Sequence, residues 1–312
     1  MRLRLGRPDL ARYADRFDVP AAGASVPRMT FLGVSTLLLD DDESALLTDG
    51  FFTRPGLLPV ALGRIGPDED RIATSLRRAG VERLDAVLPV HSHFDHVLDS
   101  AAVARRTGAR LVGGTSTLNV GRGGGLPEER LVELQAGRTF TFGHWTVEAE
   151  LSTHCPPDRY PGVIDEPLVP PAKAAAYRCG EAWSLFLSHV SGATALVQGS
   201  AGFVPGALAG RSVDVVFLGI GQLGLLGEDY LTSYWTETVR AVRPRRVVAI
   251  HWDDFFRPLP HIPGGGPLQA LPYAGDDLDV TLRVLGRLAD EDGVPLCLPR
   301  VWERENPWAA PS

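Results

Sequence analysis

The sequence predicts an α/β (α+β) fold in which two mixed β-sheets pack together and carry helices on their outer faces. Strand-like segments open the chain as a hairpin at residues 30–39 and 44–48, and further strands fill residues 139–198. Alternating strand and helix patterns flank that middle region at 68–113 and again at 213–298. Such alternation is typical of parallel βαβ units, so the whole order needs two sheets with helices outside.

The clearest local signals surround one βαβ unit. Asp68 can cap a helix that ends at Gly80, and the apolar run Leu84–Val90 is typical of a buried strand. Leu98–Thr107 is a second predicted helix, and Arg110–Gly113 is the next parallel strand. Sheets of this kind bind ligands at the carboxyl ends of their strands. The residues that follow the first of these strands therefore occupy the expected place of a site.

Other segments give weaker expectations. Residues 174–178 are predicted as a strand, and the glycine-rich residues 121–125 as a flexible connection. Residues 155–171 contain six prolines and are expected to lack regular structure. This segment and the loop 256–275 are expected to shape a pocket, although neither contains a residue pattern that identifies a ligand.

Residues 1–28 are expected to form an N-terminal extension packed on the surface of a single domain that spans residues 29–312. No linker separates two cores in this chain of 312 residues. Its formal net charge of -7 makes nucleic acid an unlikely partner, because phosphate binding favours a basic surface. The three widely spaced cysteines suggest a reducing compartment.

The cysteine count and the N-terminal pattern both predict a cytoplasmic protein. The first residues carry charge but no apolar run of signal-peptide length, and no window approaches the ~20 apolar residues of a membrane span. The oligomeric state leaves no signal in the sequence.

The sharpest chemical signal is His91–His96, which reads His-Ser-His-Phe-Asp-His directly after a predicted strand. Alternate side chains of a loop can point the same way, so His91 and His93 can hold one ion together. Asp95 and His96 then face a neighbouring position. Imidazole nitrogen and carboxylate oxygen suit zinc, with iron and manganese as alternatives. The segment therefore predicts a metal site.

At every position this segment matches the pattern His-x-His-x-Asp-His, and the chain resembles the metallo-β-lactamase-fold hydrolase superfamily from about Met29 to Leu298. Residues 31–39, followed by 46–49, look most similar to the branch of N-acyl-phosphatidylethanolamine phospholipase D-like and UlaG-like enzymes. Val34 stands where that branch usually has a histidine. The resemblance implies a four-layer αββα sandwich, which the order of the predicted elements independently allows.

The resemblance also implies two further histidines, each at the end of a later strand. His154 follows the predicted strand 145–152, and His251 follows the strand 246–250. The implied metal ligands are His91, His93 and His154 for one ion, and Asp95, His96 and His251 for a second. His189 is a rival for the role of His154.

The remaining histidines, Asp49 and Cys155 are weaker candidates for a role at the metal site. His189 lies in a hairpin region, and His144 and His261 are interpreted as structural or surface residues. Asp49 resembles a family aspartate that steadies a ligating histidine, with a simple Asp-Gly turn as the equal alternative. Cys155 is interpreted as a plain thiol, although a soft ligand or nucleophile remains an alternative.

One position departs from the family pattern. Ser200 stands after an apolar strand where the family commonly has a bridging aspartate. A neutral hydroxyl is a poor ligand beside a carboxylate, so the second ion is expected to bind more weakly. Two zinc ions are still favoured over one, because Asp95, His96 and His251 offer three ligands.

These residues predict a metal-dependent hydrolase that acts on a small molecule. A metal-bound water, with its pKa lowered to about 7, would attack a phosphodiester, lactone, amide or thioester bond. Asp95 would orient this hydroxide and accept its proton. A mononuclear iron oxidoreductase resembling sulfur dioxygenases is the alternative, and a non-catalytic metal-binding protein is the second alternative.

Overall fold

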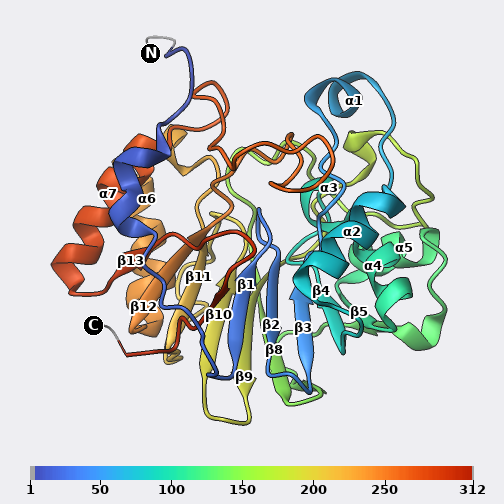
Figure 1. Ribbon diagram of the computed structural model, residues 1–312, viewed down its shortest axis with the longest axis horizontal. Helices are drawn as coiled ribbons and strands as arrows, with labels where there is room; N and C mark the ends of the chain where they lie inside the picture. The colour runs from blue at the N-terminus through green and yellow to red at the C-terminus, as the bar shows by residue number, and fades with distance from the viewer. Residues whose placement is uncertain (1–3, 311–312) are drawn as a thin grey trace.

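The structure of this protein, a computed structural model, describes residues 4–310 and is built in four layers (Figure 1). Two seven-stranded sheets lie face to face, with helices on both outer sides. The helices α2, α4 and α5 cover one sheet, and α6 and α7 flank the other. The predicted fold class is thereby confirmed. These helices span Glu69–Ala79 (α2), Ser100–Thr107 (α4), Thr115–Gly123 (α5), Glu228–Trp235 (α6) and Leu278–Asp292 (α7).

The first sheet has the order β14-β1-β2-β3-β4-β5-β6. Its strands β1, β2 and β3 are antiparallel neighbours, whereas β3 to β6 run parallel. Both patterns therefore occur in one mixed sheet, as the sequence predicts. The strands span Arg28–Phe31 (β1), Leu37–Asp40 (β2), Ala45–Thr48 (β3), Ala86–Leu88 (β4), Arg110–Gly113 (β5), Leu131–Glu133 (β6) and Arg304–Glu305 (β14).

The second sheet has the order β13-β12-β11-β10-β9-β8-β7. Here β7 to β10 are antiparallel neighbours, and β10 to β13 run parallel. The long strands β8 and β9 pair antiparallel along their full length, although residues 153–181 separate them in the sequence. The strands span Phe140–Phe142 (β7), Trp145–Ser152 (β8), Ala182–His189 (β9), Thr194–Gln198 (β10), Val215–Gly219 (β11), Arg246–Ile250 (β12) and Leu296–Cys297 (β13).

Strand β2 is apolar at successive positions because both of its faces are buried. Leu37 and Leu39 join the core between the two sheets, which also contains Trp145 and Leu196. Leu38 points to the other face and packs in the cluster beneath α2 and α4. Because successive strand residues face opposite sides, a strand buried on both faces must be apolar at every position.

Helix α2 begins and ends where its sequence predicts. The Asp68 side chain accepts a hydrogen bond from the backbone N–H of Arg71, and Gly80 ends the helix in the left-handed conformation with φ 72°. Ile72 and Leu76 supply its buried face. The boundaries of this helix thus follow from local capping chemistry.

Three expectations about local structure were wrong. The predicted strand 30–39 is broken into β1 and β2 by a turn at Gly33 and Val34, which both have positive φ. Residues 174–176 form a short 3-10 helix instead of a strand. The glycine-rich segment 121–125 is mostly the end of α5 rather than a flexible connection. A six-residue helix α1 (Leu57–Leu62) precedes α2.

The N-terminal segment contacts helix α7. A short 3-10 helix at Leu10–Arg16 places the Tyr13 hydroxyl within 2.6 Å of the Asp279 carboxylate, and Arg16 donates to the backbone oxygen of Leu296. Within residues 4–310, every helix is too short or too polar to span a lipid bilayer.

A fully buried ion pair joins three loops next to the carboxyl ends of the central strands. Arg54 pairs with Asp253, and neither side chain is exposed to solvent. Arg54 also donates to the backbone oxygens of Asp254 and Arg257, at 3.0 and 2.8 Å. The other oxygen of Asp253 accepts from the backbone N–H of Val34 at 2.8 Å. This pair therefore fixes the loop after β12 against the turn between β1 and β2.

We predict that Asp253→Asn lowers the free energy of unfolding by roughly 3–5 kcal/mol, because it leaves the Arg54 charge buried without its partner. Urea denaturation measures this change. The matched control is Glu228→Gln, whose partner Arg283 lies 2.7 Å away with both side chains more than half exposed. It should change stability by less than about 1 kcal/mol. Equal effects of the two substitutions would contradict the role given to the buried pair.

Candidate metal centre

The sequence-predicted site residues come together at one edge of the two sheets. His91 and His93 lie in the loop after β4, and Asp95 and His96 belong to the short helix α3 (Phe94–Val97) that follows it. His154 follows β8 by two residues, and His251 follows β12 directly. The ends of strands far apart in the sequence thus deliver all six side chains to one place.

One triad consists of His91, His93 and His154, with one ring nitrogen of each within 4.8 Å of the others. Their ring centroids are 4.5–4.9 Å apart, with nearly perpendicular planes. His91 is only 1% exposed, and neither of its ring nitrogens has a hydrogen-bond partner among residues 4–310. Buried polar atoms are rarely left in this state, so the arrangement fits a cation bound by three imidazoles.

A second triad consists of Asp95, His96 and His251. The Nε2 atom of His251 lies 3.2 Å from Nε2 of His96 and 3.4 Å from the Asp95 carboxylate. The rings of His91 and His96 are only 3.9 Å apart, so the two triads are neighbours. This donor set of two imidazoles and a carboxylate suits a second cation beside the first.

Hydrogen bonds orient His96 and His154. Asp49 is fully buried and accepts from Nδ1 of His96 at 2.8 Å, and its other oxygen accepts from the backbone N–H of Val90. His154 uses Nδ1 to donate to the backbone oxygen of Cys155 at 2.7 Å. In both residues Nε2 is left without a proton and faces the other histidines. The contact between Asp49 and Nδ1 of His96 fits the expected role of Asp49 in orienting this ring, which stays a prediction.

The structure adds one residue that sequence reasoning missed. The Nε2 atom of His93 lies 3.2 Å from an oxygen of Asp158 and 3.3 Å from the backbone oxygen of Tyr160. A proton on Nε2 can be donated to these two oxygens. The Nδ1 atom of His93 is then unprotonated, and its lone pair is available to a metal ion. Asp158 lies in the proline-rich segment without regular structure, so no periodic pattern marked it.

Burial and neighbouring charge control the protonation of the site. Burial holds the pKa of His91 well below 6.5, and neighbouring imidazoles add to the effect. Burial also lowers the pKa of His93, and that of His154 to about 4. Burial would lower the pKa of His96, but Asp49 and Asp95 outweigh it and raise the value. Burial opposes ionisation of Asp95, yet the nearby imidazoles hold its pKa below the usual range.

Ser200 lies at the edge of the same site, after β10. Its hydroxyl accepts from the backbone N–H of Cys155 at 3.0 Å, and both residues line the cavity beside the triads. Burial raises the pKa of the Cys155 thiol to about 12, which keeps it protonated and a poor nucleophile. The interpretation of Cys155 as a plain buried thiol fits this environment.

The remaining histidines lie away from the triads. His189 ends β9 opposite Trp145, at the other end of the strand pair from His154. There its Nε2 and the Nδ1 of His144 both contact one oxygen of Asp41, at 2.8 and 2.6 Å. His189 is therefore no part of the candidate metal centre.

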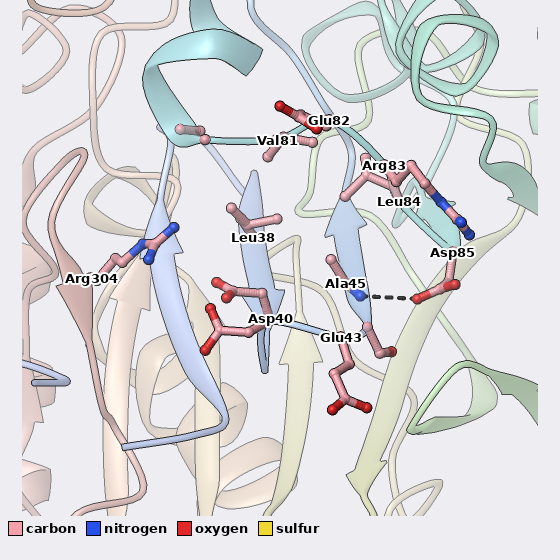
Figure 2. Close-up of a pocket in the computed structure, with 14 residues that line it drawn as sticks. Leu38, Asp40, Glu43, Ala45, Val81, Glu82, Arg83, Leu84, Asp85 and Arg304 are labelled. Atoms are coloured by element: carbon pink, nitrogen blue, oxygen red, sulfur yellow. Dashed lines mark hydrogen bonds between the residues drawn. The ribbon is translucent and has the colours of Figure 1, made fainter. Parts of the chain in front are cut away.

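Two hollows in the surface differ in their chemistry. The hollow in Figure 2, of about 370 Å³, lies at the amino-terminal end of β4 and is lined by charged side chains such as Asp40, Glu43 and Arg304. Asp85 is already engaged there, since it accepts from the backbone N–H of Ala45 at 2.9 Å. A smaller cavity of about 150 Å³ opens directly onto both histidine triads. The smaller one, at the carboxyl end of the strands, is the candidate reaction site.

Comparison with known proteins agrees with this placement. Residues 29–171, which include the motif and His154, match the family model of the metallo-beta-lactamase superfamily. The chain carries a metallo-beta-lactamase superfamily domain. The resemblance stated from the motif is thereby confirmed for the superfamily, whereas the branch stays a prediction.

Curated proteins similar to this chain carry the name UPF0173 metal-dependent hydrolase. The one from Myxococcus xanthus is 46% identical over 59 residues, which are 19% of this chain and 20% of the relative. The one from Heliobacterium modesticaldum is 24% identical over 237 residues, which are 73% of this chain and 83% of the relative. The chain thus spans only a fifth of the first relative but most of the second.

The superfamily fold is also found among solved structures. Igni18, a metallo hydrolase from Ignicoccus hospitalis, superposes with a TM-score of 0.51 at 16% identity. The match covers 89% of this chain and 96% of that one. At this identity the similarity establishes the fold.

We predict that the metal-free protein loses stability as the pH falls from 7.5 to 5. His91, His93 and His154 have folded-state pKa values below the ordinary 6.5, so the unfolded chain takes up protons first. Their stabilising effect is complete above pH 6.5 and declines toward about pH 4, the folded-state pKa of His154. Urea midpoints measured in the presence of a chelator test this. His154→Gln should show a weaker pH dependence, and an unchanged dependence would contradict the assignment.

Proposed function

We propose that this protein is a metal-dependent hydrolase of small molecules that binds two zinc ions. His91, His93 and His154 would hold one ion, and Asp95, His96 and His251 the second. The bond that it cleaves is ester-like: a phosphodiester, lactone, amide or thioester. The convergence of six ligand-type side chains into two adjacent triads carries this proposal, and the names of the curated relatives support it.

The donor set fits zinc on chemical grounds. The first triad offers three neutral imidazoles, and the second offers two imidazoles and a carboxylate. Both sets match zinc's preference for nitrogen and oxygen ligands. The buried nitrogens of His91, which find no partner within the described residues, fit the role of a cation ligand. Zinc held by these residues would supply a Lewis acid and would lower the pKa of water at the site to about 7.

The protein's own residues would prepare the reaction in three ways. Asp95 is ionised at neutral pH, so it can accept the proton of an attacking water and orient that water. Asp49 keeps the proton of His96 on Nδ1. Asp158 does the same for Nε2 of His93 and keeps the other ring nitrogen free.

Ser200 bears on the number of ions. It lines the cavity where the family pattern has a bridging carboxylate, and it offers a neutral hydroxyl. The second ion then depends on Asp95, His96 and His251 alone. We therefore propose unequal affinities, with the site of His91, His93 and His154 filling first.

We predict that His93→Ala loses one metal ion per chain and lowers the rate of hydrolysis more than about a hundredfold. Loss of a residue that only hydrogen-bonds to a metal ligand typically costs about 10–100-fold, and loss of the ligand itself should cost more. Elemental analysis and turnover of a panel of phosphodiesters, lactones, amides and thioesters measure the two effects. His261→Asn is the matched control, since His261 is exposed and its positive φ tolerates asparagine. Metal-replete protein without turnover across the panel would contradict the proposal, and a single iron would favour an oxidoreductase.

We also predict that Asp158→Ala weakens binding of the first zinc ion by about 10–100-fold, because the tautomer of His93 is no longer held. Competition with a zinc-binding dye measures this affinity. Asp165→Ala is the control, since Asp165 is an exposed carboxylate in the same proline-rich segment. If both variants bind zinc equally well, Asp158 has no role in positioning His93.

A further inference from the structure

The cavity beside the triads has two kinds of wall. At one end, the polar groups are the histidines, Asp95 and Ser200. Apart from these groups, Cys155, Gln222 and the exposed Arg159, the wall is largely apolar, and its larger apolar side chains come from five separate segments. These apolar side chains are Leu57, Val60 and Ala61 of α1, Phe94, Tyr160, Phe255 and Phe256, and Leu271.

The apolar wall begins at the candidate metal centre itself. The ring of Phe255 lies 5.9 Å from that of His251, 4.4 Å from Phe256 and 6.3 Å from Phe94. These aromatic rings form a continuous surface that leads away from the second triad. A group attached to the cleaved bond therefore meets hydrocarbon within one ring width of the ligands.

Charge is scarce on this wall. Apart from Asp95 and the histidines, Arg159 is the one ionisable side chain with a permanent charge among the described residues that line the cavity, and it is exposed at the mouth. A charged group against the apolar wall, away from the triads, would lose its water without gaining a partner. This part of the cavity thus selects against charge, as apolar pockets with a few convergent polar groups do.

Helix α1 extends the apolar surface outward. Leu57 lines the cavity and is still 59% exposed, and its neighbours Leu58 and Leu62 are 72% and 84% exposed. Figure 1 shows α1 at the rim of the molecule, above α3. Because this patch is continuous with the cavity wall, an apolar group too long for the cavity can lie along it.

We propose that the substrate carries an uncharged apolar group, an aliphatic acyl chain or an aromatic ring, next to the bond that is cleaved. A cavity of about 150 Å³ accepts a benzene-sized group, and the exposed leucines take the remainder of a longer chain. This inference rests on the proposed hydrolase function for its chemistry, but the apolar binding site stands on the cavity alone.

The first test compares substrates that differ only in chain length. Thioesters of N-acetylcysteamine with acyl chains of two to eight carbons, and γ-lactones with side chains of zero to six carbons, serve as the series. We expect kcat/KM to rise about threefold to fourfold per added methylene, until the chain passes the end of α1. Hydrolysis with equal kcat/KM along both series would overturn the inference and leave the hydrolase function standing.

Variants locate the effect on α1. Leu57→Ser and Leu58→Ser should flatten the rise of kcat/KM with chain length, because both replace apolar surface that the chain contacts. Val190→Ser is the matched control, since Val190 is 74% exposed in the turn between β9 and β10, at the far end of the sheet. An equal flattening in the control would overturn the assignment to α1.

The second test needs no turnover. In metal-free protein, 1-hexanol should displace a bound naphthalene dye at a concentration at least tenfold lower than ethanol does. Equal potency of the two alcohols, or no dye binding, would overturn the inference. If neither substrate series is hydrolysed by metal-replete protein but the alcohols still differ, then the hydrolase function fails while the apolar site stands.

Discussion

The structure depends on burying five imidazoles and one carboxylate within a few ångströms of one another. Such groups lose their hydration, and each unpartnered nitrogen costs about 1–3 kcal/mol. The fold accepts this cost most clearly at His91, whose ring is buried among other histidines with both nitrogens unpaired within the described residues. A bound cation turns the same lone pairs into ligands.

The backbone near the site is also strained. Val34, Asp49 and His251 all have positive φ, at 52°, 53° and 61°, which costs on the order of 1–3 kcal/mol for each residue. Two of these positions are hydrogen-bonded, since the N–H of His251 donates to the carbonyl of Val34. The third, Asp49, contacts the ring of His96. The buried pair of Arg54 and Asp253, together with the core between the sheets, offsets this strain. Stability made elsewhere thus keeps the site in its geometry.

Local signals in the sequence predicted what depends on local chemistry. The capped helix α2 and the histidine motif after β4 are of this kind, and the strand ends at His154 and His251 followed from the superfamily pattern. The sequence could not show what depends on distant contacts. Asp158 reaches His93 across 65 residues through an irregular segment, and helix α1 has exposed leucines where amphipathic helices have polar residues. The helical periodicity of apolar residues reveals helices that pack against the domain core. A short helix whose apolar side chains line a cavity does not show this pattern clearly.

The proposed ligand sets have unequal charge, and this asymmetry has a chemical consequence. The first triad is neutral, the second contributes the single carboxylate of Asp95, and Ser200 adds none. Two divalent ions held by these residues would keep a large excess of positive charge in a site of low effective dielectric. That excess would weaken binding of the second ion. It would also stabilise negative charge that develops on the oxygen of the bond under attack. Under the proposed function, a serine at this position would therefore lower metal affinity and strengthen the electric field at the reacting bond.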